Sequence, residues 1–215
     1  MARSKYINTF NTTSDYDAYI DSALPEFPNV ALDKQENKLK IQRTSPNSHV
    51  IYGTLTNPNT PPTFKFNNNN NQKVTAHVDL LDNTFYIDAS DMSGVTTPIT
   101  SLGNFLTADN NVTSIKKIKL DTTHVTSISG LFYVTENLTS IDLTSFNLSS
   151  FTGSPDSTFY RSNSLTDVYV SYENTLNIIT NNLSSQGNSY VPSSATIHYN
   201  GTDYKWQNNA WTPQS

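Results

Sequence analysis

The 215-residue chain contains no cysteine, which excludes a disulfide framework, a cysteine-ligated zinc site and a thiol nucleophile. Charged residues are scarce, at 14% of the chain, and 13 Lys and Arg face 18 Asp and Glu. The resulting net charge of −5 argues against nucleic-acid binding, because phosphates must be neutralised by a basic surface. No apolar run exceeds four residues (Leu131–Val134), and the N-terminus lacks the apolar stretch of a secretory signal. We therefore expect no membrane insertion and no signal peptide.

Asn, Thr and Ser are abundant instead and supply 82 of the 215 residues. Ser, Thr and Asn disfavour helix interiors, whereas Thr, Tyr and Phe suit strands and Asn suits turns. The composition predicts a mainly β fold with short helices.

Residues 1–55 predict a small α+β module. Ser14 is a suitable N-cap for a helix that Pro25 ends, and three short strands are expected at 30–32, 38–42 and 49–55. A unit of this size buries too little to be stable alone, so we expect it to serve attachment or oligomerisation. Its candidate contact residues are aromatic: Tyr6, Phe10, Tyr16, Tyr19 and Phe27.

Residues 56–72 read as a linker rich in Pro and Asn. The stretch TNPNTPP is typical of linkers, and the run Asn67–Asn71 is interpreted as a solvated loop tip, with an Asn ladder or a ligand surface as the alternative.

Residues 73–215 contain an internal repeat. The stretches VTSI, LTSI and LTDV begin at Val112, Leu138 and Leu165, which are 26 and 27 residues apart. This period lies in the range of leucine-rich repeats, in which each turn contributes one short strand and stacking buries the core. We expect the return segments of the turns to be anchored by Phe105, Phe132 and Phe159.

The strand positions of three turns predict an outer ladder. We align the triplets Ile118–Leu120, Ile141–Leu143 and Val168–Val170. The first and third residues of each triplet should point into the core. Their central residues would then form a row on the outer face, which is the candidate binding face: Lys119, Asp142 and Tyr169.

The C-terminal residues predict a cap for this repeat. Ser171 is expected to precede a helix with apolar residues Leu176, Ile179 and Leu183, and Asn200-Gly201 is a strong hairpin signal. The fold predicted for 73–215 is thus a short, irregular leucine-rich-repeat-like solenoid that displays its surface, with a helix and a β-hairpin as its cap.

The sequence of the repeat, VTSISGLF…NLTSIDLTSFNLSSFTG, resembles the BspA-type leucine-rich repeats of bacterial surface proteins over about residues 95–170. The opening, with Phe10, Thr12, Tyr16, Tyr19, Pro28 and Val30, is similar to N-terminal segments of virion proteins from crAss-like phages of Bacteroides. Together the resemblances imply a phage structural protein that displays a repeat domain on a short attachment module.

Motifs for catalysis are not found. No nucleophile motif precedes a histidine, and no carboxylate pair has a recognisable setting, so we predict no enzyme, no catalytic residue and no cofactor. Asp79, Asp82, Asp88 and Asp91 are close in sequence but lack calcium-loop spacing, so solvated positions are favoured over a metal site. The cluster Lys116, Lys117 and Lys119 is interpreted as a solvent-facing strand, with an anion site as the alternative.

The leading hypothesis is a head-fibre or capsid-decoration subunit of a virion, made in the host cytoplasm. Its partners would be capsid or other virion proteins, further copies of itself in a homo-oligomer and a host surface glycan. The alternative is an adhesin-like bacterial surface module that binds host protein or glycan, and an enzyme such as a depolymerase is the third.

Overall fold

The computed structural model describes residues 8–10, 30–33, 38–41, 49–66, 71–80, 82–181 and 191–214. The chain divides into two compact units, Met1–Ser48 and His49–Ser215. In the first unit, β2 (Val30–Asp33) pairs in parallel with β1 (Asn8–Phe10) and antiparallel with β3 (Lys38–Ile41). The predicted strands at 30–32 and 38–42 are confirmed, β1 is an addition, and the helix predicted after Ser14 lies outside the described residues.

The second unit is built on a mixed sheet, which has nine strands in the described residues, in the order β14-β13-β12-β11-β10-β9-β4-β8-β7. Its strands are β4 (Ile51–Leu55), β7 (His77–Asp79), β8 (Thr84–Ile87), β9 (Val112–Ile118), β10 (Ser140–Leu143), β11 (Asp167–Val170), β12 (Thr196–Tyr199), β13 (Thr202–Gln207) and β14 (Ala210–Pro213). The hairpin of β5 (Thr63–Phe66) and β6 (Gln72–Thr75) forms a separate two-stranded sheet. The short helices described are η2 (Asp91–Gly94) and α2 (Glu173–Asn181), so the fold is mainly β.

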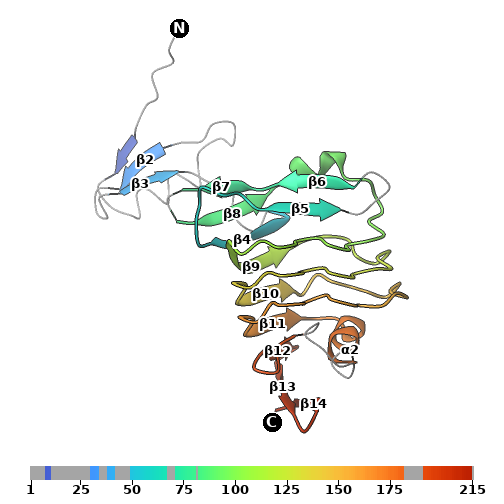
Figure 1. The fold of residues 1–215 in the computed structure, drawn as a ribbon. Helices are drawn as coiled ribbons and strands as arrows, with labels where there is room; N and C mark the ends of the chain where they lie inside the picture. Colours follow the sequence, from blue (N-terminus) through green and yellow to red (C-terminus); the bar gives the residue numbers. More distant parts are fainter. Residues whose placement is uncertain are drawn as a thin grey trace. The chain divides into compact units, whose positions relative to one another are not determined.

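Strands β9 to β12 lie side by side in parallel, with the long return segments between them on one side (Figure 1). The return segments repeat their backbone geometry as well. Two left-handed positions recur at intervals of 26 and 27 residues, one at Asn104, Gly130 and Ser157 and the other at Ala108, Val134 and Arg161. The period found in the sequence is therefore a structural period.

The abundance of Ser and Thr is explained by hydrogen bonds between neighbouring turns. The Thr139 N–H and hydroxyl both donate to the Thr113 carbonyl, at 2.8 and 2.9 Å, and Thr166 repeats this arrangement on Thr139. Inside the unit, the buried hydroxyls of Thr135 and Ser162 are 2.9 Å apart. Buried polar groups must be paired, and short hydroxyl side chains do this without adding bulk.

The core lies between the inner face of the sheet and the return segments. Phe105, Phe132 and Phe159 are buried in successive turns, as predicted, with ring centroids 6.3 and 5.6 Å apart. The inward residues of the strands complete this core, with Ile141 and Val168 fully buried.

The boundaries predicted at 55 and 72 are wrong, because the second unit begins at His49. Strand β4 pairs with β8 and β9 inside the large sheet, so it is not part of an N-terminal module. The predicted linker also packs on this unit: Phe64 and Phe66 are fully buried against Phe105, at 5.1 and 5.2 Å. The Asn111 side chain fixes the Pro-rich stretch by donating to the carbonyls of Asn57 (2.8 Å) and Thr60 (2.6 Å).

The C-terminal elements follow the prediction. Helix α2 buries Leu176 and Ile179, and Leu183 lies outside the described residues. Asn200 and Gly201, both with positive φ, form the turn between β12 and β13, and β14 pairs antiparallel with β13.

Candidate functional site

The outer face of the large sheet carries a row of aromatic and charged residues that crosses its strands. Residues on neighbouring strands in register point to the same side of a sheet, so strand pairing defines this row in two parts, from His77 to Lys117 on β7, β8, β4 and β9, and from Asp142 to Asp203 on β10 to β13. From β7 to β13, the outer row consists of His77, Tyr86, Tyr52, Lys117 with Lys116, Asp142, Tyr169, His198 and Asp203.

One part of the outer row, on β11 to β13, is tightly organised. The rings of Tyr169 and His198 stack with centroids 4.4 Å apart and an interplanar angle of 16°. The His198 imidazole contacts two carboxylates, with Nε2 2.9 Å from Asp167 Oδ1 and Nδ1 2.7 Å from Asp203 Oδ1. Because both ring nitrogens donate to carboxylates, this geometry selects the imidazolium form.

The ionisation of this cluster follows from its contacts. Partial burial lowers the pKa of His198, but the hydrogen bonds to Asp167 and Asp203 outweigh it and the pKa is raised overall. The hydrogen bond from His198, assisted by that from Thr166, lowers the pKa of Asp167. Burial and then the charges of Asp167, Asp203 and Asp142 raise the pKa of Tyr169 above its ordinary value.

A second aromatic stack lies at the other end of the outer row. The Tyr86 ring stacks on His49 (4.4 Å, 12°) and on His77 (5.1 Å, 28°). His77 Nε2 is 2.9 Å from Asp91 Oδ1, and Asp91 Oδ2 accepts the Asp88 N–H at 2.8 Å. At this end His49 is fully buried and Asp91 begins η2, whereas the His77 side chain is about half exposed.

The predicted ladder is correct on two of its three strands. Asp142 and Tyr169 are in register on β10 and β11, with their neighbours Ile141, Leu143, Val168 and Val170 buried inward. Lys119 is not in this row. Ile141 pairs with Ile115, not with Ile118, and Lys116, the next residue of β9, has its Nζ 5.8 Å from the centroid of the Tyr52 ring.

The cause of this error is a bulge in β9. Tyr52 pairs with Lys117 and Gly53 with Ile115, so one extra residue of β9 lies between these pairs. The bulge lets Ile115 and Ile118 both point into the core, although they are three residues apart. Lys119 follows the strand, where its N–H donates to the Val50 carbonyl, and Leu120 is only partly buried.

Most of the aromatic residues predicted for the attachment module lie outside the described residues: Tyr6, Tyr16, Tyr19 and Phe27. The remaining one, Phe10, ends β1 opposite Asp33. Sequence reasoning missed the cluster residues His198, Asp167 and Asp203. The Asn200-Gly201 turn was the available signal, because a two-residue hairpin turn places His198 opposite Asp203.

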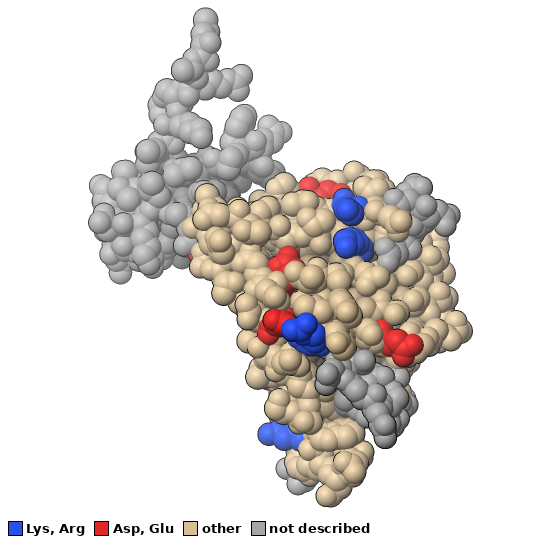
Figure 2. Space-filling view, viewed as in Figure 1, with Lys and Arg blue, Asp and Glu red and all other residues tan. Residues whose placement is uncertain are grey.

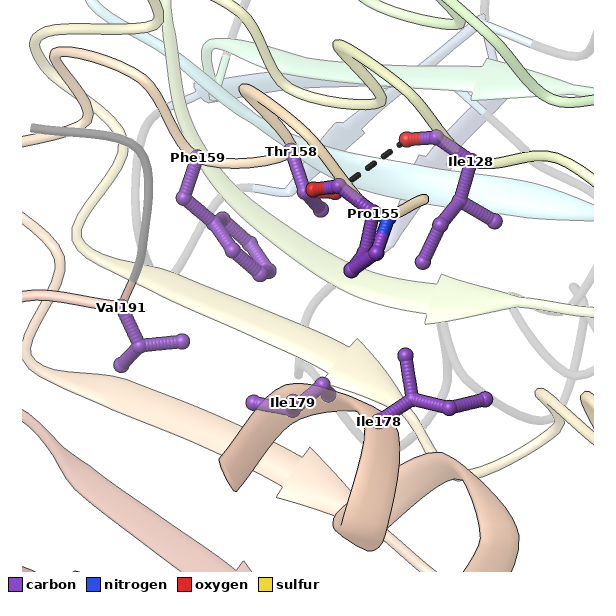
Figure 3. A pocket seen from close by; sticks show the side chains of 7 residues that line it. All are labelled: Ile128, Pro155, Thr158, Phe159, Ile178, Ile179 and Val191. Atoms are coloured by element: carbon purple, nitrogen blue, oxygen red, sulfur yellow. Dashed lines mark hydrogen bonds between the residues drawn. The ribbon is translucent and has the colours of Figure 1, made fainter. Parts of the chain in front are cut away.

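The two pockets described are poor ligand sites. One is about 10 Å³, room for a single water at most, and is lined by apolar side chains including Ile178, Ile179 and Phe159, with Thr158 donating to the Ile128 carbonyl at 3.3 Å (Figure 3). The other, about 220 Å³, lies beside η2 and is lined by Met92, Val95, Lys119 and other residues; it is smaller than pockets that enclose drug-sized ligands.

Charge is sparse on the face of the second unit that Figure 2 shows. Small Lys, Arg, Asp and Glu patches, an acidic and a basic one in contact among them, lie within a largely uncharged surface. Among the described residues, no three or more His, Asp or Glu side chains are grouped to hold a metal ion. None of the helices in the described ranges has both the length and the apolar character needed to cross a membrane.

Comparison with known proteins gives no relative: no protein-family model matches the sequence, and no curated protein or solved structure is significantly similar to it.

Proposed function

We propose that this chain is a non-enzymatic structural protein of a phage virion, a head-fibre or capsid-decoration subunit. Residues 1–48 would attach it to capsid or other virion proteins, and the unit from His49 to Ser215 would be displayed outward. In this proposal β9 to β12 and their return segments form a short leucine-rich-repeat-like solenoid, and the chain acts as a homo-oligomer.

The observation that carries the proposal is the contrast between the two faces of the repeat region. The inward face of β10 and β11 is fully apolar, with Ile141, Leu143, Val168 and Val170 buried, whereas the outer row is polar and ordered. An ordered polar face on a packed scaffold suits display and recognition. The resemblance of about 40 residues at the start of the chain to phage virion proteins supports the virion as its location.

The arrangement of the histidines favours binding over catalysis. A general base needs a ring nitrogen free to take a proton, and both nitrogens of His198 already donate to carboxylates. His77 Nε2 is likewise engaged by Asp91. We therefore propose no catalytic role for either.

The alternative, an adhesin-like module on a bacterial surface, is favoured by the resemblance of residues 95–170 to bacterial surface repeats. The two proposals differ in where the chain is found: an adhesin would be on the surface of uninfected cells.

Particle incorporation tests the attachment role. Tagged full-length chain and a variant lacking residues 1–48 are expressed in the host during infection, and the released particles are purified on a density gradient. We expect the full chain to band with particles and the truncated chain to remain unbound although folded. Equal incorporation of both chains would contradict the assignment of attachment to residues 1–48.

A further inference from the structure

Tyr169 is unusual among the exposed side chains of the second unit. In the described residues, the large hydrophobic side chains that are exposed are Leu80, Tyr169 and Tyr172, and of these Tyr169, 40% exposed, alone lies within a strand. Its strand has neighbours on both sides, so the ring projects from the interior of an ordered face and not from a loop.

The ring of Tyr169 is held in place before any ligand arrives. It stacks on His198, and His198 is in turn fixed by Asp167 and Asp203. A rigid aromatic side chain loses little conformational entropy on binding, which is why tyrosine is favoured at recognition surfaces.

The neighbours of Tyr169 on the β10 side supply polar groups of both kinds. Asp142 lies in register with Tyr169, and its Oδ1 accepts hydrogen bonds from the N–H (2.8 Å) and hydroxyl (2.6 Å) of Thr144. Its Oδ2 accepts no hydrogen bond from the described residues and can accept one from a ligand. Exposed Lys116 lies on β9, one strand beyond Asp142; its Nζ is 5.8 Å from the centroid of the Tyr52 ring, and its flexible side chain must turn toward β10 to donate to the same ligand.

This combination matches the two sides of a sugar ring. A pyranose presents a C–H face that packs on an aromatic ring and a rim of hydroxyls that both donate and accept hydrogen bonds. Tyr169 offers the first contact, Asp142 an acceptor and Lys116 a donor. The charges nearby are mixed, with Asp142, Asp167 and Asp203 against His198 and Lys116, so a neutral ligand is favoured over an acidic one that would meet three carboxylates.

We propose that Tyr169, Asp142 and Lys116 bind one ring of a neutral glycan, with the sugar stacked on Tyr169 and its hydroxyls bonded to Asp142 and Lys116. The inference deepens the proposed function and rests on it, since it assigns the displayed face a ligand class.

Saturation-transfer NMR on the full chain tests the proposal. The probes are neutral tetrasaccharides of glucose, mannose, galactose and N-acetylglucosamine, used at about 5 mM to detect weak binding. Tetragalacturonate, tetraglucosamine and tetralysine are the charged comparators. We expect at least one neutral probe to receive saturation, strongest at its ring C–H protons.

The variants locate the contact. Tyr169→Ala should lower the saturation at least fivefold, and Asp142→Asn and Lys116→Gln should each weaken binding. Tyr172→Ala is the matched control, because Tyr172 is 42% exposed but lies beyond β11, and it should bind as the unchanged chain does. Unchanged circular dichroism verifies that each variant is folded.

Three results would overturn the proposal: no binding of any neutral probe, binding of charged probes only, or equal binding by Tyr169→Ala and Tyr172→Ala. The proposed function is judged separately, because Tyr169→Ala should still enter particles. If the chain binds a glycan but is absent from particles, the virion role is contradicted and the proposed sugar site is not.

Discussion

Phe132→Ala is expected to remove a large part of the stability of the second unit. Phe132 is fully buried, and its ring lies between those of Phe105 (6.3 Å) and Phe159 (5.6 Å). Replacing a buried Phe by Ala typically costs about 3–5 kcal/mol, and here two ring contacts to neighbouring turns are lost together, so we expect about 4 kcal/mol. This is a substantial fraction of the roughly 5–15 kcal/mol that stabilises a typical domain.

The assay is urea unfolding followed by tryptophan fluorescence. Both tryptophans of the chain, Trp206 and Trp211, lie in β13 and β14, so the signal reports on the second unit alone. The neighbouring substitution Tyr133→Ala is the matched control: Tyr133 also stacks on the next turn, on Tyr160 at 5.0 Å, but both rings are only partly buried. It should cost no more than about 1 kcal/mol. A loss below about 1 kcal/mol for Phe132→Ala, or equal losses for both variants, would refute the stacked-turn core.

Three further predictions use the same assay. Gly53→Ala should destabilise by about 1–3 kcal/mol or more, because a Cβ there would lie 2.1 Å from the Ser114 carbonyl oxygen and 2.6 Å from the Phe85 ring; unchanged stability would contradict the close approach of β4 and β9. Val134→Asn should stabilise by up to about 1 kcal/mol, since Asn tolerates the left-handed φ of 58° better than a β-branched residue, and a loss of stability would count against it. The pKa of His198 is raised in the folded chain, so the contribution of His198 to folding stability is complete below its ordinary pKa of 6.5 and is lost as the pH rises through the higher folded pKa. The urea midpoint should therefore be lower at about pH 8.5 than at about pH 5.5. The variant His198→Gln should reduce that difference.

The features that the sequence predicts correctly are those with a local or periodic signal. The 26-residue spacing of VTSI and LTSI matches the pairing of Ile115 with Ile141, and the spacing of Phe105, Phe132 and Phe159 matches the buried ring column. The Asn200-Gly201 hairpin is encoded by two residues that tolerate positive φ.

The features that it does not predict depend on contacts distant in sequence. Strict alternation favours Ile118, Lys119 and Leu120 as a strand triplet, but β9 carries a bulge at Lys116 where it pairs with β4, and Ile115 is the residue that pairs with Ile141. A Pro-rich composition is likewise typical of a linker, and only the contacts to Asn111, more than 50 residues away, show why 56–60 is held in place. The Asp167–His198 contact spans 31 residues and carries no local signal.

The central claim, that this chain is a structural component of a virion, is tested most directly by quantitative mass spectrometry of particles purified by successive density gradients. The account predicts that peptides of this chain co-purify with the major capsid protein at a constant ratio through every gradient step. A ratio that falls toward zero with purification, while the chain remains abundant in the lysate or on uninfected cells, would contradict it.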